Sequence, residues 1–259
     1  MPFADLQDVQ IHYDLKGPAT APVLVFSNSL GANLSMWDAQ LTDFSSNMRV
    51  LRYDTRGHGA SSAPSGPYNF DQLGNDVIGL LEALRIDRVF FCGLSMGGMI
   101  GQWLGVHAPD RMNKLVLCST GAKIGNAETW NARIDTVRRL GMKSISTAVI
   151  ERWFTARFRE QSPGLVEETK QMIESTDVEG YAACCGALRD SDLRASLSAI
   201  RTPTLVISGT HDPATPPADG HFLADSISGA RYVELDAAHL LNIERRERFT
   251  AELRSFLSA

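Results

Sequence analysis

The chain has 259 residues, of which 44% are hydrophobic, and a formal net charge of −5. This length fits one large domain, or one domain with an insertion, and the apolar content is ample for a core. The negative charge and the absence of a polybasic block argue against a nucleic-acid or anionic-membrane partner.

Four cysteines, at positions 92, 118, 184 and 185, lack the spacing of a zinc site or a C-x-x-C redox motif. No disulfide framework is indicated, and residues 1–8 lack the basic and apolar regions of a secretory signal. We therefore expect a cytoplasmic protein.

The first predicted strands lie near residue 3 and at 11–13, as an antiparallel pair. Apolar runs that predict further strands follow at 23–26, 50–53, 89–92, 115–118, 205–207 and 232–235. Most of these runs are continuous rather than alternating, which is typical of strands covered on both faces.

Helical patterns lie between the strands. Apolar stripes with a 3.6-residue period run over residues 70–84 and 243–257. The alternation predicts an α/β fold with a mostly parallel eight-stranded sheet and helices on both faces. Residues 89–106 approach the length of a membrane span, but their five glycines favour a strand, a turn and a helix.

The alternation stops between residues 121 and 200, where helical patterns dominate. One stripe joins Trp130, Ile134 and Val137, and another joins Ile150, Trp153, Phe154 and Phe158. We interpret residues 122–199 as a helical cap over the carboxyl edge of the sheet. Residues 1–121 and 200–259 then form the core domain.

Residues 93–97 read Gly-Leu-Ser-Met-Gly and directly follow a predicted strand. In a G-x-S-x-G turn between strand and helix, the glycines permit close backbone approach and Ser95 projects over the sheet edge as a nucleophile. The alternative interpretation is a glycine-rich turn that serves packing alone.

Partners for Ser95 follow two later predicted strands. A serine hydroxyl needs a general base, and the base needs an acid that fixes its tautomer. Asp212 follows the 205–207 run and His239 follows the 232–235 run. Because parallel strands end at one edge, we predict a catalytic triad of Ser95, Asp212 and His239. For each partner the alternative is structural: a turn aspartate before a proline and a lone histidine.

An oxyanion hole requires backbone N–H groups aimed at the developing negative charge. Met96 directly follows the nucleophile at a predicted helix N-terminus, and Leu30 lies in the loop after the 23–26 strand. We predict that these two residues are the donors.

Taken together, these motifs resemble the α/β-hydrolases over nearly the whole chain. The resemblance rests on residues 27–31, 54–61, 93–98, 108–111, 209–212 and 238–239. Asn28-Ser29 stands where His-Gly is usual, and Ala238 stands where glycine often precedes the histidine. Neither departure removes a catalytic group, and we interpret His58 as a residue that shapes its loop.

More narrowly, residues 28–31, 93–101 and 130–133 resemble the 3-oxoadipate enol-lactonases of bacterial aromatic catabolism. This resemblance implies hydrolysis of an enol-lactone with an acetate side chain to 3-oxoadipate, through a Ser95 acyl-enzyme in the β-ketoadipate pathway. It implies no metal and no organic cofactor.

The substrate carboxylate then needs a cation, preferably a planar bidentate one. Arg133 flanks the first stripe of the cap and is our first choice, with Arg157 as the second. Trp130 and Trp153 are candidates to line the substrate site. The structural alternatives are solvated arginines and tryptophans of the cap core.

Two other functions remain open at this stage. A broader carboxylesterase, or a cofactor-free haloperoxidase-like hydrolase, uses the same triad. A small-molecule binding protein on a hydrolase fold is the alternative from another class, because fold alone does not fix function. The oligomeric state is left open.

Overall fold

The computed structural model describes residues 2–259, which form one eight-stranded sheet with the strand order β1-β2-β4-β3-β5-β6-β7-β8. The β1–β2 and β2–β4 pairs are antiparallel and all other pairs are parallel. The predicted α/β fold is confirmed. The strands are β1 (Phe3–Asp5), β2 (Gln10–Lys16), β3 (Val23–Ser27), β4 (Arg49–Tyr53), β5 (Val89–Leu94), β6 (Met112–Cys118), β7 (Thr204–Gly209) and β8 (Arg231–Leu235).

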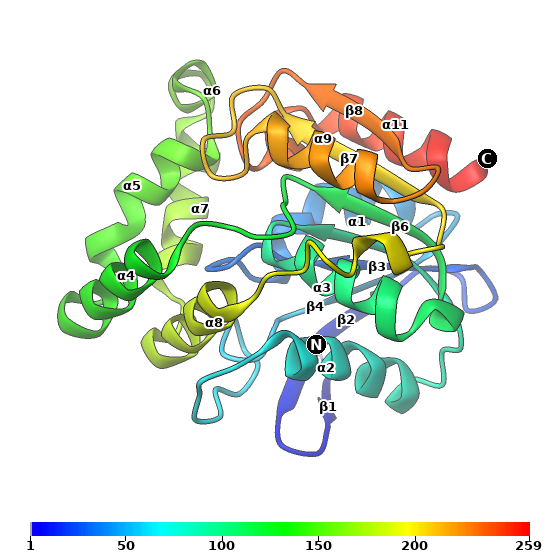
Figure 1. Ribbon diagram of the computed structural model, residues 1–259, viewed down its shortest axis with the longest axis horizontal. Coiled ribbons are helices and arrows are strands. Elements are labelled where there is room, and N and C mark those ends of the chain that lie inside the picture. Colours follow the sequence, from blue (N-terminus) through cyan, green and yellow to red (C-terminus); the bar gives the residue numbers. More distant parts are fainter. Residues whose placement is uncertain (1) are drawn as a thin grey trace.

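Helices cover both faces of this sheet: α2, α3 and α9 lie on one face, and α1 and α11 on the other (Figure 1). Every residue of β3 and β7 is buried, which explains why their apolar runs are continuous. The helices of the core are η1 (Leu34–Trp37), α1 (Asp38–Phe44), α2 (Phe70–Ala83), α3 (Met96–His107), η2 (Pro109–Arg111), η3 (Leu197–Ala199), α9 (Pro217–Ser226), α10 (Leu241–Glu244) and α11 (Arg246–Ser258).

Helix α2 illustrates how local sequence sets an element. The Asn69 side chain accepts a hydrogen bond from the Gln72 N–H at 2.9 Å, and the Gln72 side chain accepts from the Asn69 N–H at 3.1 Å. This capping box satisfies two N–H groups that a helix start leaves free. The apolar stripe of the helix is buried at Phe70, Leu73, Val77, Leu80 and Leu81, and α2 packs beside α3.

Between β6 and η3, five α-helices pack mainly on one another, beyond the carboxyl ends of the strands (Figure 1). We call them the helical insertion. One detail of the sequence interpretation is wrong: the stripe from Ile150 to Phe158 is not one helix, because Phe154 is extended and Thr155 caps a new helix. The members are α4 (Ala127–Leu140), α5 (Lys143–Trp153), α6 (Ala156–Gln161), α7 (Pro163–Glu174) and α8 (Val178–Asp190).

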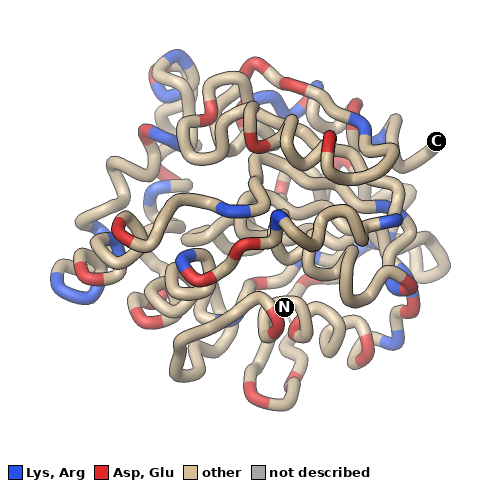
Figure 2. The backbone as a smooth tube through the Cα atoms, in the orientation of Figure 1, with Lys and Arg blue, Asp and Glu red and all other residues tan. Residues whose placement is uncertain are grey.

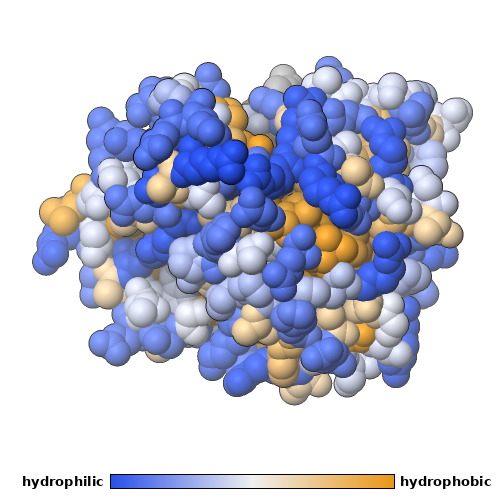
Figure 3. Space-filling model, turned by 90° about the horizontal axis from the view of Figure 1, so that it is seen from above, coloured by the Kyte–Doolittle hydropathy of each residue, from blue (hydrophilic) through white to orange (hydrophobic). Residues whose placement is uncertain are grey.

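The apolar stretch at 89–106 forms β5, a turn and α3, as predicted. Within residues 2–259, no helix combines the length and the apolar character needed to cross a bilayer. Basic and acidic residues are interspersed along the backbone rather than gathered by sign (Figure 2). The face seen from above is mostly hydrophilic, with an apolar area near its centre (Figure 3).

Candidate active site

Ser95 occupies the sharp turn between β5 and α3. Its backbone has φ 59° and ψ −114°, a conformation that costs energy for any residue with a side chain. Hydrogen bonds on both sides hold the turn: the Ser95 N–H donates to Cys118 O at 2.9 Å, and the Thr120 hydroxyl donates to Ser95 O at 2.7 Å. The neighbouring strand β6 therefore fixes the position of the serine.

The glycines of the motif are required by close backbone approach. A Cβ atom at Gly93 would lie 2.1 Å from Gly97 O, and one at Gly97 would lie 2.4 Å from Ser27 O. Neither contact is possible for a real side chain, so the strand, the turn and the helix pack this closely only with glycine. The motif thus has the structural context that its sequence predicts.

Asp212 and His239 form a buried hydrogen-bonded pair. His239 Nδ1 lies 2.7 Å from Asp212 Oδ2, and both residues are at most 3% exposed. The Thr215 hydroxyl donates to Asp212 Oδ2 at 2.7 Å, and the backbone N–H groups of Ala214 and Thr215 donate to Oδ1. Burial opposes ionisation of Asp212, but the His239 and Thr215 contacts outweigh it and hold the pKa of the carboxyl below its usual value.

The loops that carry these two residues are joined through their backbones. Thr210 N–H donates to Leu235 O and His211 N–H donates to Ala237 O, each at 2.9 Å. A Cβ atom at Gly209 would lie 2.3 Å from Ala238 O, so the two loops approach as closely as glycine permits. The acid and the histidine are therefore fixed relative to each other by β7 and β8.

The structure brings Ser95, Asp212 and His239 to the same carboxyl edge of the sheet, after β5, β7 and β8. Among the described residues, His239 Nε2 has no hydrogen-bond partner and the Ser95 hydroxyl forms no hydrogen bond to it.

The other histidines are engaged elsewhere. His12 contacts Asp54 at 2.6 Å, and His211 contacts Asp236 at 2.9 Å. The rings of His107 and His221 pack on Trp103 and Tyr232. His58 also has a structural contact, with the loop after β3.

The two predicted oxyanion donors are unpaired. Among the described residues, neither the Leu30 N–H nor the Met96 N–H has a hydrogen-bond acceptor, although both residues are buried. The residues that follow them are paired: Gly31 N–H donates to His58 Nε2 and Gly97 N–H donates to Asn28 O, each at 3.0 Å. Buried unpaired N–H groups are rare. The N–H groups of Leu30 and of Met96, the residue after Ser95, therefore mark a place for an acceptor.

Side chains hold the Leu30 loop in place. The Asn28 amide donates to Tyr53 O at 2.8 Å and accepts from the Trp37 indole N–H at 3.0 Å. The unusual Asn28 is thus fully used in positioning. His58 accepts from Gly31 on one ring nitrogen and contacts Arg56 O with the other, and burial lowers its pKa, which favours the neutral ring. The expectation that His58 shapes this loop is confirmed.

The helical insertion brings one predicted tryptophan to the pair. The ring of Trp153 stacks on His239, with centroids 6.4 Å apart and planes 25° from parallel. Trp130 instead donates its indole N–H to Ile124 O at 2.7 Å and packs under the Arg133 guanidinium, 5.3 Å from its ring centroid. Arg157, the second choice for a carboxylate ligand, is exposed.

A second arginine, Arg152, lies near Arg133 and was missed by the sequence analysis. Burial lowers the pKa of Arg152, and the charge of Arg133 lowers it further. Burial raises the pKa of Tyr181, while the charges of Arg133 and Arg152 oppose the rise. The Tyr181 ring lies against the Leu30 loop, since a Cβ atom at Gly31 would be 3.1 Å from it.

Neither Arg133 nor Arg152 forms a salt bridge among the described residues. By contrast, Arg138, which lies with Arg133 on α4, pairs with Glu179 at 2.9 Å. Two cations that share a partly buried region without a carboxylate are energetically unfavourable. They are suited to bind an anion that comes from outside the chain. Arg133 and Arg152 belong to different helices, so no local spacing reveals the pair. Within residues 2–259, no group of His, Cys, Asp and Glu side chains is arranged to hold a metal ion.

Comparisons with known proteins agree with this geometry. The family described as alpha/beta hydrolase fold matches residues 22–246. The 3-oxoadipate enol-lactonase 2 of Acinetobacter baylyi is 48% identical, over 94% of this chain and 91% of that protein. The 3-oxoadipate enol-lactonase 1 of the same organism is 37% identical, over 98% and 95%.

A crystal structure of the enol-lactonase from Burkholderia xenovorans superposes on this chain with a TM-score of 0.98 at 48% identity. The superposition covers 100% of both chains, so the core and the helical insertion are shared. The chain belongs to the α/β-hydrolase family, and within it is related to the 3-oxoadipate enol-lactonases.

Proposed function

We propose that this hydrolase converts 3-oxoadipate enol-lactone to 3-oxoadipate through an acyl-enzyme on Ser95, in the β-ketoadipate pathway of aromatic degradation. The observation that carries the proposal is the pair of unpaired N–H groups at Leu30 and Met96, beside a serine that shares its sheet edge with a buried Asp212–His239 pair. The relatives named above support the choice of substrate.

The first half of the reaction acylates the enzyme. His239 Nε2 takes the Ser95 hydroxyl proton while the oxygen attacks the lactone carbonyl, and Asp212 stabilises the imidazolium that forms. The Leu30 and Met96 N–H groups bind the oxyanion, a contribution of about 3–4 kcal/mol per donor in comparable sites. The C–O bond of the ring then breaks and an enolate leaves. The enolate takes up the proton that His239 accepted from Ser95 and becomes the ketone of the 3-oxoadipyl chain, which leaves His239 neutral for the second half.

The second half releases the product. His239 takes a proton from water, the resulting hydroxide attacks the acyl carbonyl, and the ester bond to Ser95 breaks. The proton returns to the serine and a carboxylate leaves. Because an enolate is a better leaving group than an alkoxide, acylation depends more on the oxyanion donors than on acid assistance.

The acetate side chain of this lactone carries a carboxylate that remains charged throughout. We assign it to Arg133, with Arg152 as a second cation, because both lack a carboxylate partner among the described residues. Arg133 also lies beside Tyr181, whose ring contacts the Leu30 loop. Trp153 contributes an apolar surface over His239. Trp130 supports Arg133 from below.

The chain then divides by role. We propose that residues 1–121 and 200–259 supply the chemistry as the core domain and that residues 122–199 act as a cap that selects the substrate. A small-molecule substrate, with no nucleic-acid or membrane partner, and a cytoplasmic location complete the proposal.

The test compares three substrates with the purified enzyme: the carboxylate-bearing enol-lactone, a neutral enol-lactone and a neutral phenyl ester. We expect kcat/KM for the first to exceed that for the second by about 10- to 100-fold, because a hydrogen bond to a charged group contributes about 1.5–3 kcal/mol. Equal values would indicate a broad carboxylesterase. Binding of the lactone without turnover of any substrate would indicate a binding protein.

A further inference from the structure

The loop that carries His239 is joined to the helical insertion by one buried carboxylate. Glu244, the last residue of α10, is 8% exposed. Its Oε2 accepts from the Ala238 N–H at 3.1 Å and from the Thr155 N–H at 3.3 Å, and its Oε1 accepts from the Thr155 hydroxyl. One side chain thus connects the residue before the histidine to the cap of helix α6.

A second link lies on the other side of the histidine. Leu240 N–H donates to Trp153 O at 3.0 Å, and the Trp153 ring stacks on His239 itself. Trp153 therefore contacts His239 and Leu240 directly, while Thr155 reaches Ala238 through the Glu244 side chain. The imidazole is therefore held from two sides, by Asp212 on the sheet side and by a segment of the insertion.

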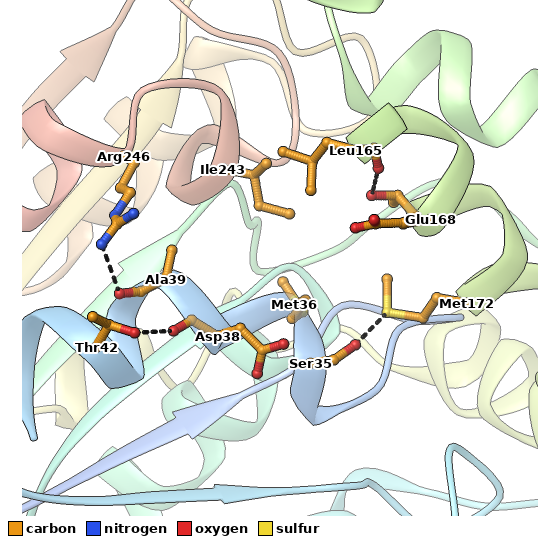
Figure 4. Close-up of a pocket in the computed structure, with 11 residues that line it drawn as sticks. Ser35, Met36, Asp38, Ala39, Thr42, Leu165, Glu168, Met172, Ile243 and Arg246 are labelled. Carbon is orange, nitrogen blue, oxygen red and sulfur yellow. Dashed lines mark hydrogen bonds between the residues drawn. The ribbon is translucent and has the colours of Figure 1, made fainter. Parts of the chain in front are cut away.

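The insertion is less closely attached near α7. A groove of about 470 Å³ separates α7 from η1, α1 and α10 (Figure 4). Leu165, Glu168 and Met172 face it from α7, and a 3.6 Å contact from the Ser35 hydroxyl to Met172 Sδ crosses it. Packing on this side leaves room, so the contacts around Glu244 carry more of the alignment between the insertion and His239.

Burial of the Glu244 carboxylate is unfavourable unless its oxygens are hydrogen-bonded. A buried carboxylate needs full hydrogen bonding, and Glu244 has no cation partner among the described residues. A glutamine at this position would present one NH2 group where two N–H groups and a hydroxyl now donate. The NH2 group would require the Thr155 hydroxyl to turn from donor to acceptor, and the two N–H groups would donate to a neutral oxygen instead of a charged one, so the link would weaken.

We propose that Glu244 is a positioning residue that holds His239 and Trp153 in the arrangement needed for proton transfer. It touches neither substrate nor reacting atoms and acts through Ala238 and Thr155. This proposal depends on the proposed function in one respect only, namely that His239 is the general base.

The experiment compares Glu244→Gln with Glu174→Gln as a matched control. Glu174 accepts from the Ser146 hydroxyl at 2.7 Å, a similar contact that lies wholly within the insertion. For both variants we would measure kcat and KM on a neutral phenyl ester, the rate at which a phosphonate labels Ser95, and Tm.

We expect Glu244→Gln to lower kcat and the labelling rate by about 10- to 100-fold with KM changed by less than about 3-fold, as for a loss confined to the transition state. Glu174→Gln should stay within about 3-fold of wild type in both rates, even where the two variants lose similar Tm. Equal losses of activity in the two variants would overturn the proposal. So would wild-type rates in Glu244→Gln.

Thr155→Val keeps the proposal testable if Glu244→Gln does not fold. It removes the hydroxyl that donates to Glu244 and that also caps α6, and it should lower kcat in the same direction. Where Glu244→Gln does fold, the effect of Thr155→Val on kcat should largely disappear in the double variant, because both changes weaken the same link. Full additivity would contradict the link. Use of a neutral ester keeps these outcomes independent of whether the enol-lactone is the natural substrate.

Discussion

His239 Nδ1 lies 2.7 Å from Asp212 Oδ2, although 27 residues of sequence separate the two. The Thr215 hydroxyl donates to the same carboxylate oxygen, and two backbone N–H groups satisfy the other. With Nδ1 bound in this way, the lone pair of the imidazole is directed from Nε2, the atom that a general base toward Ser95 requires.

Replacement of Asp212 by asparagine tests this relationship. An amide leaves the geometry nearly unchanged but no longer stabilises the imidazolium and permits the wrong tautomer. We expect kcat to fall by about 10³- to 10⁴-fold with little change in KM. Steady-state kinetics on a neutral ester would measure this, and a loss below about 10-fold would remove Asp212 from the triad.

The two arginines of the insertion predict a split between substrates. Arg133→Met and Arg152→Met should each raise KM for the carboxylate-bearing lactone by about 10- to 100-fold and leave the neutral ester nearly unchanged. Arg157→Met is the matched control, because Arg157 is exposed and should affect neither substrate. If Arg133→Met and Arg152→Met slow the hydrolysis of both substrates equally, the carboxylate binds elsewhere.

Sequence reasoning reached the fold, and the placement of Ser95, Asp212 and His239 at one edge of the sheet, for a definite physical reason. Buried parallel strands need continuous apolar runs, and the carboxyl ends of such strands converge, so positions after strands predicted where Asp212 and His239 lie. Gly93 and Gly97 could also be recognised in the sequence, because the close backbone contacts at these two positions permit only glycine.

The helical insertion was less predictable. Arg152 and Arg133 approach only when α4 and α5 pack, and helical periodicity does not specify which faces meet. The break at Phe154 was missed because the apolar spacing continues across it. The only local mark of the break is Thr155, the N-cap of the next helix, and no proline or glycine stands there. Glu244 was missed because its donors lie in other parts of the sequence.

A methyl group at Gly93 should disrupt the nucleophile turn. The added Cβ would lie 2.1 Å from Gly97 O, so Gly93→Ala should lower the free energy of unfolding by about 1–3 kcal/mol or more and displace Ser95. In Gly164→Ala, the control, the new Cβ has nothing within 4 Å, and stability should stay equal or rise slightly. Urea denaturation and ester turnover would measure both. A stable and fully active Gly93→Ala enzyme is incompatible with the close packing described.

His58 predicts a dependence of stability on pH. Burial lowers its folded-state pKa below the ordinary 6.5, so the unfolded chain binds more protons once the pH falls below that value. Its contribution to stability is therefore present above 6.5 and is lost as the pH falls toward the folded-state pKa. Urea midpoints between about pH 7 and about pH 5 should fall more steeply for the wild type than for His58→Gln. Parallel curves would contradict this role for His58.

Acylation of Ser95 is the step on which the proposed reaction depends. The direct measurement mixes the enzyme with 3-oxoadipate enol-lactone, stops the reaction with acid, and determines the intact mass and the modified peptide. We predict a mass gain of one lactone on the peptide that contains Ser95, and neither adduct nor turnover in a folded Ser95→Ala variant. Near wild-type hydrolysis by Ser95→Ala, or an adduct on another residue, would contradict the mechanism.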